Sequence, residues 1–343
     1  MAEHQIVKAE KIAAAAAVAL DSQLVIPSVF RRESIDQFRG AKNDAINVKV
    51  EGVLPYRSYG WRADRSQEVV FDEYAERTLQ VTFGDDLYSA VKLTDEQAEM
   101  DELNWAKLML KQTDAVGRGI NDACVEGLTD APYEVELALD PANLKSGLIR
   151  ARQVMNQLRT PAGQRTILVG TDVEAALLED EKLNLASNVG ESEAVSALRE
   201  ATLGRRYGFN FVVAQELDPA TAVALVDSAF VVVTGAPAVP QSVPFGASAS
   251  ANGWAVRWIR DYDSTRFQDR SIVNTYFGTR HVPDVLVGKD GTGQSFISTQ
   301  EHFVRAIKLN LGGSDVLPPA TGGNAMQAEL RNITGLKAAP AGG

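Results

Sequence analysis

The chain has 343 residues, of which 45% are hydrophobic and 23% are charged, proportions that fit a folded protein and exclude a disordered one. Its net charge of −11 argues against a general nucleic-acid-binding surface, which needs an excess of cations to replace counterions. One cysteine and three histidines exclude a disulfide framework, a cysteine-rich zinc site and a Cys-x-x-Cys redox pair. At roughly 150 residues per domain, the length predicts about two domains.

The N-terminal 45 residues carry too few apolar side chains to form a core of their own. The apolar run Ile12 to Leu20 predicts an alanine-rich helix over 6–20, and it is shorter than the roughly 20 residues that a membrane span needs. Acidic residues interrupt the basic start that a signal peptide requires, so we expect a cytoplasmic chain. Phe30, Arg31 and Arg32 follow the helix. We expect this segment to be an arm that lies on another surface.

Two extended segments flank a polar, aromatic loop. Residues 46–53 alternate between apolar and polar side chains, the period of a half-exposed strand, and residues 67–83 also favour an extended conformation. Because an isolated hairpin is marginal in water, we expect this one to find support on a partner surface. The loop between the two segments carries the candidate contact residues Arg57, Trp61, Arg62 and Arg65.

The clearest helix starts at a capping box, Thr94-Asp95-Glu96-Gln97, in which the threonine and glutamine side chains exchange hydrogen bonds with the backbone. A stripe of apolar and small residues at helical spacing follows and predicts a long helix over 94–127. The stripe is Leu103, Ala106, Leu110, Thr113, Gly117, Ile120 and Cys124.

The second half of the chain has an α/β texture. Asp140 and Pro141 predict the N-cap and first residue of a further helix. We expect strands over 166–170, 209–213, 229–234, 254–261 and 271–277, helices over 171–178 and 192–202, a Pro/Gly/Ser-rich loop over 235–252, an amphipathic patch at 303–309, and a flexible tail over 312–343.

No residue pattern predicts catalysis. The chain has no phosphate-binding glycine loop followed by Lys-Ser/Thr and no Gly-x-Ser-x-Gly motif. Asp261 and Asp263 lack the rest of a calcium loop. Cys124 lies on the apolar helix stripe with no histidine near it in sequence, which indicates a buried small side chain. We therefore expect no catalytic residue, no cofactor and no metal, and we interpret the protein as a non-enzyme.

The order of elements resembles the major capsid (coat) proteins of tailed double-stranded DNA phages, which have the Hong Kong 97-type fold. The resemblance covers roughly residues 1–282. Within it, Leu203 to Gln215 is similar to a glycine, aromatic, strand and polar passage of phage coat proteins. Leu87 to Gln97, at the entry to the long helix, looks like the coat proteins of actinobacterial phages.

The resemblance implies an α+β fold with a peripheral domain, its long spine helix and an axial α/β domain. The implied boundaries are an N-terminal arm over 1–45, an extended β-hairpin loop over 46–93, a peripheral domain over 94–164, an axial domain over 165–282, and a C-terminal segment with a flexible tail over 283–343.

It also implies that the protein assembles as hexamers and pentamers into an icosahedral shell around double-stranded DNA, without sequence-specific binding and without a membrane. The implied location is the virion, assembled in the host cytoplasm. We expect a separate scaffold protein, because the spine helix begins too early in the chain for a fused scaffolding segment. The other implied partners are a portal protein and, as an optional partner, a decoration protein. Implied inter-subunit contacts are Phe30, Arg31, Arg32, Arg57, Trp61, Arg62 and Arg65.

Two sequence features refine this interpretation. No lysine occurs over 51–91, so we expect none of the isopeptide cross-links that a lysine of the extended loop forms in the type member. Residues 51–127 carry eight basic and sixteen acidic side chains, which suits an inner wall that does not adhere to DNA. The alternatives are an encapsulin-type compartment shell with the same fold and, less favoured, an α/β enzyme.

Overall fold

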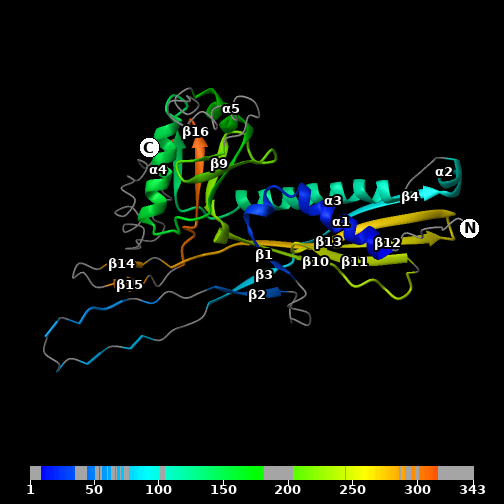
Figure 1. Ribbon diagram of the computed structural model, residues 1–343, viewed down its shortest axis with the longest axis horizontal. Helices are drawn as coiled ribbons and strands as arrows, with labels where there is room; N and C mark the ends of the chain where they lie inside the picture. The colour runs from blue at the N-terminus through cyan, green and yellow to red at the C-terminus, as the bar shows by residue number, and fades with distance from the viewer. Residues whose placement is uncertain are drawn as a thin grey trace, which may run out of the picture. The chain divides into compact units, whose positions relative to one another are not determined.

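Figure 1 shows the computed structural model of the chain. The structure describes residues 9–34, 45–50, 77–100, 105–180, 204–243, 245–285, 287–289, 295–297 and 301–315, together with short stretches within 54–72. None of the helices in these ranges is long and apolar enough to cross a membrane. The chain folds into two compact units. Unit 1 comprises Met1–Ile46, Gln80–Asp130 and Phe230–Arg280, and unit 2 comprises Asn47–Leu79, Ala131–Ala229 and His281–Gly343.

Unit 1 is built on a six-stranded sheet with the order β1-β10-β13-β12-β11 and with β4 paired to β13. Alternate residues of β12 point to the same face of the sheet. On one face these residues are the buried Trp254, Val256 and Trp258, which contribute to the core of unit 1. The strands are β1 (Arg31–Ser34), β4 (Asp85–Thr94), β10 (Phe230–Gly235), β11 (Phe245–Ala251), β12 (Trp254–Asp263) and β13 (Gln268–His281).

Three helices belong to unit 1: α1 (Ala9–Gln23), α2 (Asp95–Met100) and α3 (Trp105–Thr129). α1 packs against α3, β11 and β12, and α3 packs against β4 (Figure 1). The capping box is confirmed, because the Thr94 backbone N–H donates to Gln97 Oε1 at 3.3 Å and the Gln97 N–H donates to Thr94 Oγ1 at 3.5 Å. The predicted stripe is correct at Thr113, Ile120 and Cys124, which are buried.

At its N-terminal end the stripe is wrong by one residue. Leu110 is 39% exposed, and Met109 is the buried side chain. An α-helix has 3.6 residues per turn, so consecutive side chains point about 100° apart around the axis. An error of one residue therefore assigns the buried position to the wrong side chain. Leu103 lies outside the described residues.

Residues 9–34 do not form an arm separate from the core, which differs from the expectation for 1–45. Ala13, Ala16, Ala17 and Leu20 of α1 are fully buried. β1 pairs in parallel with β10, from Arg31 beside Val231 to Ser34 beside Thr234. Small alanine side chains let α1 approach the sheet closely, so this segment completes the core of unit 1.

Unit 2 contains a second six-stranded sheet, with the order β5-β16-β9-β6-β8-β7. Every residue of β6 is buried, as expected for a strand covered on both faces. The strands of this sheet and the two helices of unit 2 are β5 (Glu136–Leu139), α4 (Leu144–Gln157), β6 (Arg165–Val169), α5 (Thr171–Glu179), β7 (Arg205–Arg206), β8 (Phe209–Val213), β9 (Thr221–Val226) and β16 (Ala306–Leu311). Short pieces complete the described chain: β2 (Ala45–Val50) with β3 (Arg77–Thr82), β14 (Val287–Lys289) with β15 (Ser295–Ile297), and the 3-10 helices η1 (Pro27–Val29) and η4 (Asp227–Ala229).

The two units do not follow the linear boundaries 94–164, 165–282 and 283–343. Residues 230–280 pack with the spine helix in unit 1, and residues 131–164 belong to unit 2. Residues 306–309 of the expected patch belong to β16, which lies between β5 and β9 inside the unit 2 sheet. Pairing between strands far apart in sequence assembles both sheets, and a linear sequence pattern does not report such pairing.

Two local predictions were wrong. Asp140 is not the N-cap of α4, because the helix begins at Leu144 and Asp140 Oδ1 accepts from the Ala142 N–H at 2.9 Å in the preceding turn. The expected loop at 235–252 contains β11, whose small residues pair with β12 from Phe245 beside Arg260 to Ala251 beside Trp254. The helix expected at 192–202 and most of the expected tail lie outside the described residues.

Candidate functional site

The loop between β2 and β3 exposes large apolar side chains in the positions that the structure describes. Trp61 is 91% exposed, Phe71 is 90% exposed and Val69 is 64% exposed. Monomeric proteins expose few such clusters, and aromatic side chains with arginine are enriched in protein interfaces. This exposed loop, defined here by residues 54–72, is therefore the main candidate surface for contact with another protein.

The arginines of this loop have different surroundings. Arg57 Nη1 pairs with Asp72 Oδ2 at 2.5 Å, an ion pair between the outgoing and returning limbs of the loop. Arg62 is exposed in a turn and has a positive φ of 59°. Arg65 lies outside the described residues. An exposed pair such as Arg57 with Asp72 contributes little to stability in water.

The three candidate contact residues near the N-terminus are engaged within unit 1. Phe30 is 4% exposed and its ring stacks on Phe230, with the ring centroids 5.0 Å apart. Arg31 Nη2 pairs with Glu33 Oε1 at 2.8 Å. Arg32 Cζ lies over the Trp254 ring, 5.3 Å from its centroid. Phe30 is thus a core residue of unit 1.

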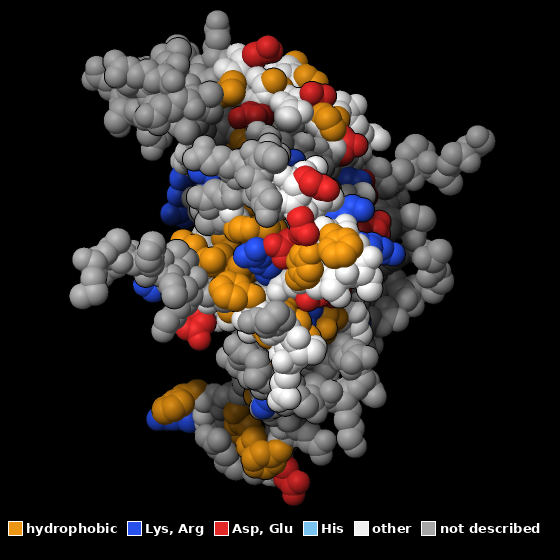
Figure 2. All heavy atoms as spheres, turned by 90° about the vertical axis from the view of Figure 1, so that its right-hand side faces the viewer, with side chains coloured by type: hydrophobic (Ala, Val, Ile, Leu, Met, Phe, Trp, Pro, Cys, Tyr) orange, Lys and Arg blue, Asp and Glu red, His pale blue; other side chains and the backbone are white. Residues whose placement is uncertain are grey.

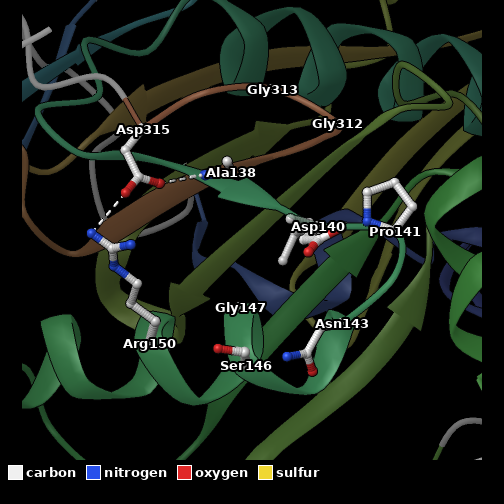
Figure 3. Close-up of a pocket in the computed structure, with 11 residues that line it drawn as sticks. Ala138, Asp140, Pro141, Asn143, Ser146, Gly147, Arg150, Gly312, Gly313 and Asp315 are labelled. Atoms are coloured by element: carbon white, nitrogen blue, oxygen red, sulfur yellow. Dashed lines mark hydrogen bonds and ion pairs between the residues drawn. The ribbon is translucent and has the colours of Figure 1, made fainter.

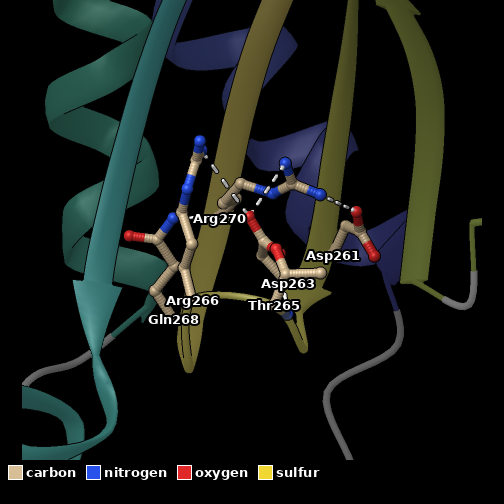
Figure 4. Close-up of polar contacts among 6 residues, drawn as sticks. All are labelled: Asp261, Asp263, Thr265, Arg266, Gln268 and Arg270. Atoms are coloured by element: carbon tan, nitrogen blue, oxygen red, sulfur yellow. Dashed lines mark hydrogen bonds and ion pairs between the residues drawn. The ribbon is translucent and has the colours of Figure 1, made fainter.

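The end of the β12–β13 hairpin carries a cluster of ion pairs (Figure 4). Arg270 Nη2 pairs with Asp261 Oδ2 at 2.6 Å, and Arg270 Nη1 lies 3.6 Å from Asp263 Oδ2. The hydroxyl of Thr265 donates to Asp263 Oδ1 at 2.6 Å and lowers the pKa of that carboxyl. Arg270 thus neutralises Asp261 and Asp263, the two aspartates that the sequence analysis considered as ligands for a metal cation.

Hydrophobic side chains accompany this cluster. Figure 2 looks onto the face reached by the end of the hairpin, where hydrophobic, basic and acidic side chains lie side by side. Phe267 is 68% exposed and Tyr262 is 46% exposed. The Tyr262 hydroxyl donates to Asp95 Oδ2 at 2.9 Å, and this hydrogen bond raises the pKa of the tyrosine.

Two buried ionisable groups of the described chain are Cys124 and His302. Burial raises the pKa of the Cys124 thiol far above its ordinary value, so the group stays protonated and unreactive. His302, 6% exposed, is a packed residue whose Nδ1 atom lies 2.6 Å from Glu134 Oε1. Within the described residues no group of three or more His, Cys, Asp or Glu side chains is placed to hold a metal ion.

Unit 2 contains a pocket of about 540 Å³ between the start of α4 and the end of β16 (Figure 3). Arg150 Nη2 pairs across it with Asp315 Oδ2 at 2.7 Å. Asp315 Oδ1 accepts from the Ala138 N–H at 2.9 Å. These contacts fasten the chain that follows β16 to α4 and β5, and the lining holds no nucleophile beside a base.

Comparisons with known proteins agree with a structural role. A model of the family described as phage capsid protein matches residues 88–275. No curated protein matches the chain. The fold is similar to a solved structure from Mycobacterium phage Che8, with a TM-score of 0.57 at 14% identity over 84% of this chain and 91% of that one.

Two further solved structures have a similar fold. The bacteriophage PhiM1 mature capsid gives a TM-score of 0.55 at 12% identity over 84% of this chain and 87% of that one. The capsid of cyanophage P-SCSP1u gives 0.55 at 11% identity over 83% and 90%. At these identities the likeness establishes the fold, and the family match covers more than half of the chain. The chain therefore belongs to the phage capsid protein family and has the Hong Kong 97-type fold of tailed-phage major capsid proteins.

Proposed function

We propose that the protein is the building block of an icosahedral shell, that it assembles as hexamers and pentamers, and that the shell encloses double-stranded DNA in the virion. The observation that carries the proposal is the exposed loop at residues 54–72, whose apolar side chains find no core within the described chain. A stable interface buries about 1,600 Å² in total. A long loop laid on a neighbouring subunit reaches that area, and repetition around a closed shell multiplies its effect.

The charge of the chain supports a container for DNA. The eight basic and sixteen acidic side chains of residues 51–127 give this segment most of the net charge of −11. An acidic wall repels the phosphate backbone and keeps packaged DNA releasable. We propose as partners a separate scaffold protein and a portal protein, with a decoration protein as an optional outer partner, and assembly in the host cytoplasm.

The loop provides the direct test. Replacing Trp61 and Phe71 together by alanine removes the two most exposed aromatic side chains among the described residues, and should leave the subunit folded while abolishing shells. Tyr88→Ala is the matched control, because Tyr88 is an exposed aromatic residue, 70% exposed, on β4 of unit 1. Negative-stain microscopy of the protein, expressed with and without its scaffold, gives the readout. Shells of normal yield from the double variant would contradict the role of the loop, and single subunits under every condition from the unsubstituted chain would contradict the shell itself.

A further inference from the structure

Cations gather in one region of unit 2, although the chain as a whole is acidic. Residues 141–171 contain five lysine or arginine residues and no acidic one, and residues 204–215 contain two arginines and no acidic one. The seven cations are Lys145, Arg150, Arg152, Arg159, Arg165, Arg205 and Arg206.

The structure brings part of this set together on α4 and the β7–β8 hairpin. Arg152 Nη1 donates to the Tyr207 carbonyl at 2.9 Å. Tyr207 and Gly208 form the hairpin turn with φ of 51° and 85°, and a Cβ added at Gly208 would lie 3.2 Å from Arg152 Cζ. The glycine therefore lets the turn lie directly against the guanidinium. We call the exposed side chains Arg152, Arg159 and Arg205 the basic end of unit 2.

A buried arginine reinforces the positive potential of the basic end. Arg165 is 3% exposed. It donates to Asn156 Oδ1 at 2.8 Å, the Thr160 carbonyl at 2.7 Å and the Pro161 carbonyl at 2.8 Å, all of them neutral acceptors. Burial, and then the charge of Arg152, lower the pKa of Arg165. Within the described residues no ion pair neutralises Arg152, Arg159 or Arg205. Burial together with the charge of Asp180 raises the pKa of Tyr207, and Asp180 sets one negative charge against the three positive charges of the basic end.

The opposite end of the same strands is acidic. β6 begins at Arg165, and its five residues span about 16 Å. Beyond its far end α5 begins, against the turn that joins β8 to β9, where the Asp172 N–H donates to the Pro219 carbonyl at 3.0 Å. Residues 171–176 and 214–221 contain no lysine or arginine. We call Asp172, Glu174, Glu216 and Asp218 the acidic end of unit 2; among the described residues they form no ion pair.

We propose that the basic end of unit 2 docks onto the acidic end of unit 2 in a second copy of this chain. A strand length separates the two ends within one molecule, so they cannot neutralise each other there. Two copies placed head to tail bring opposite charges together, and each copy keeps one end available for the next. Such a heterologous contact closes into a ring when the rotation between copies is a whole fraction of a turn.

The inference rests on the proposed hexamers and pentamers and assigns one contact within those rings. Duplex DNA would also satisfy the basic end through its phosphates. DNA binding leaves the acidic end without a role, whereas a second copy accounts for both ends with one contact.

Charge reversal tests the contact. Arg159→Glu with Arg205→Glu reverses the basic end, and Glu174→Lys with Glu216→Lys reverses the acidic end. Lys107→Glu with Arg118→Glu is the control for the first pair, because both are exposed on α3 in unit 1 and the change in net charge is the same. We expect each end variant alone to lose at least ten-fold in ring and shell yield by sedimentation velocity and electron microscopy, and the control to assemble as the unsubstituted chain does.

Mixing the two end variants gives the sharpest readout. Alternating copies restore opposite charges at every contact of a six-membered ring, whereas a five-membered ring keeps one like-charged contact. We expect the mixture to recover hexamers without closed shells, and the chain with all four substitutions to recover both. If the charge reversals prevent folding, the neutral double variant Arg159→Gln with Arg205→Gln replaces them in the test. Its yield of rings should not depend on salt concentration as the yield of the unsubstituted chain does.

Other outcomes overturn the proposal. End variants that assemble as the control does would exclude the contact, and a basic-end variant that changes only the nucleic-acid content of normal shells would assign that end to DNA. If the unsubstituted chain forms neither rings nor shells, the proposed function fails instead.

Discussion

At the residue scale, a buried hydrogen-bond network joins the spine helix to the sheet of unit 1. Trp258 Nε1 donates to Ser271 Oγ at 3.0 Å, and Ser271 Oγ donates to Gln112 Oε1 at 2.7 Å. Gln112 Nε2 donates to the Ser89 and Ser271 carbonyls at 3.0 and 2.9 Å. Gln112 thus contacts two neighbouring strands from one position on α3 and fixes the register of the helix. The sequence did not single out this glutamine, because only the folded chain brings its partners together.

Gln112→Ala should lower the free energy of unfolding by about 1–3 kcal/mol, because it leaves the Ser89 and Ser271 carbonyls without a donor and the Ser271 hydroxyl without an acceptor. Lys111→Ala is the control, since the Lys111 side chain is 82% exposed on the same helix. Urea unfolding of the soluble subunit, followed by circular dichroism, measures both. Equal midpoints for the two variants would show that the network does not stabilise the unit.

The Cys124 thiol should resist alkylation by iodoacetamide at pH 8. Burial raises its pKa, and a pKa above the working pH leaves almost no thiolate to react. In urea the thiol returns to an ordinary pKa and should label completely within the same time. Fast labelling of the native protein would show that α3 opens readily around Cys124.

At the element scale, sequence pattern predicts individual segments well when their signals are local. The capping box at Thr94 and the apolar strand at Phe209–Val213 depend on neighbours in sequence, and both are present as expected. The predicted start of α4 was too early, because an aspartate such as Asp140 can cap a helix or accept a hydrogen bond within a turn. Here its carboxylate accepts from the backbone of the turn that precedes the helix. The assignment of β10 and β13 to unit 1 depends on strand pairing across long sequence separations, which the pattern does not encode.

The junction between β6 and α5 should be intolerant of any side chain. A Cβ at Gly170 would lie 2.3 Å from the Asp218 carbonyl oxygen, whereas nothing lies within 4 Å of a Cβ at Gly163. Gly170→Ala should therefore destabilise the subunit by about 1–3 kcal/mol through overpacking. Gly163→Ala should stay within about 0.5 kcal/mol of the unsubstituted chain. Thermal unfolding of the two variants compares them directly, and similar melting temperatures would refute the steric argument.

At the scale of the whole molecule, the family and the fold were predictable from the order of segments, whereas the surroundings of single side chains were not. Phe30 illustrates the limit, because an aromatic residue beside two arginines is typical of an interface and equally of a strand that completes a sheet. The loop of residues 54–72 remains the candidate interface, since its exposed aromatic side chains are observed in the folded subunit.

Mature particles should run as a single band of monomer mass on a denaturing gel. A covalent link from the extended loop needs a lysine, and none occurs over 51–91. A ladder of oligomers from the unsubstituted chain would contradict the expectation.

The interleaving of the two units has a consequence for synthesis on the ribosome. Unit 1 needs residues up to Arg280 before its last strand is available, and unit 2 needs β16, which ends at Leu311. Neither unit is a continuous stretch of chain, so neither can finish folding while much of the protein is still being translated. Nascent chains on one messenger therefore lack finished surfaces for premature association, and the pool available for shell building consists of nearly complete polypeptides.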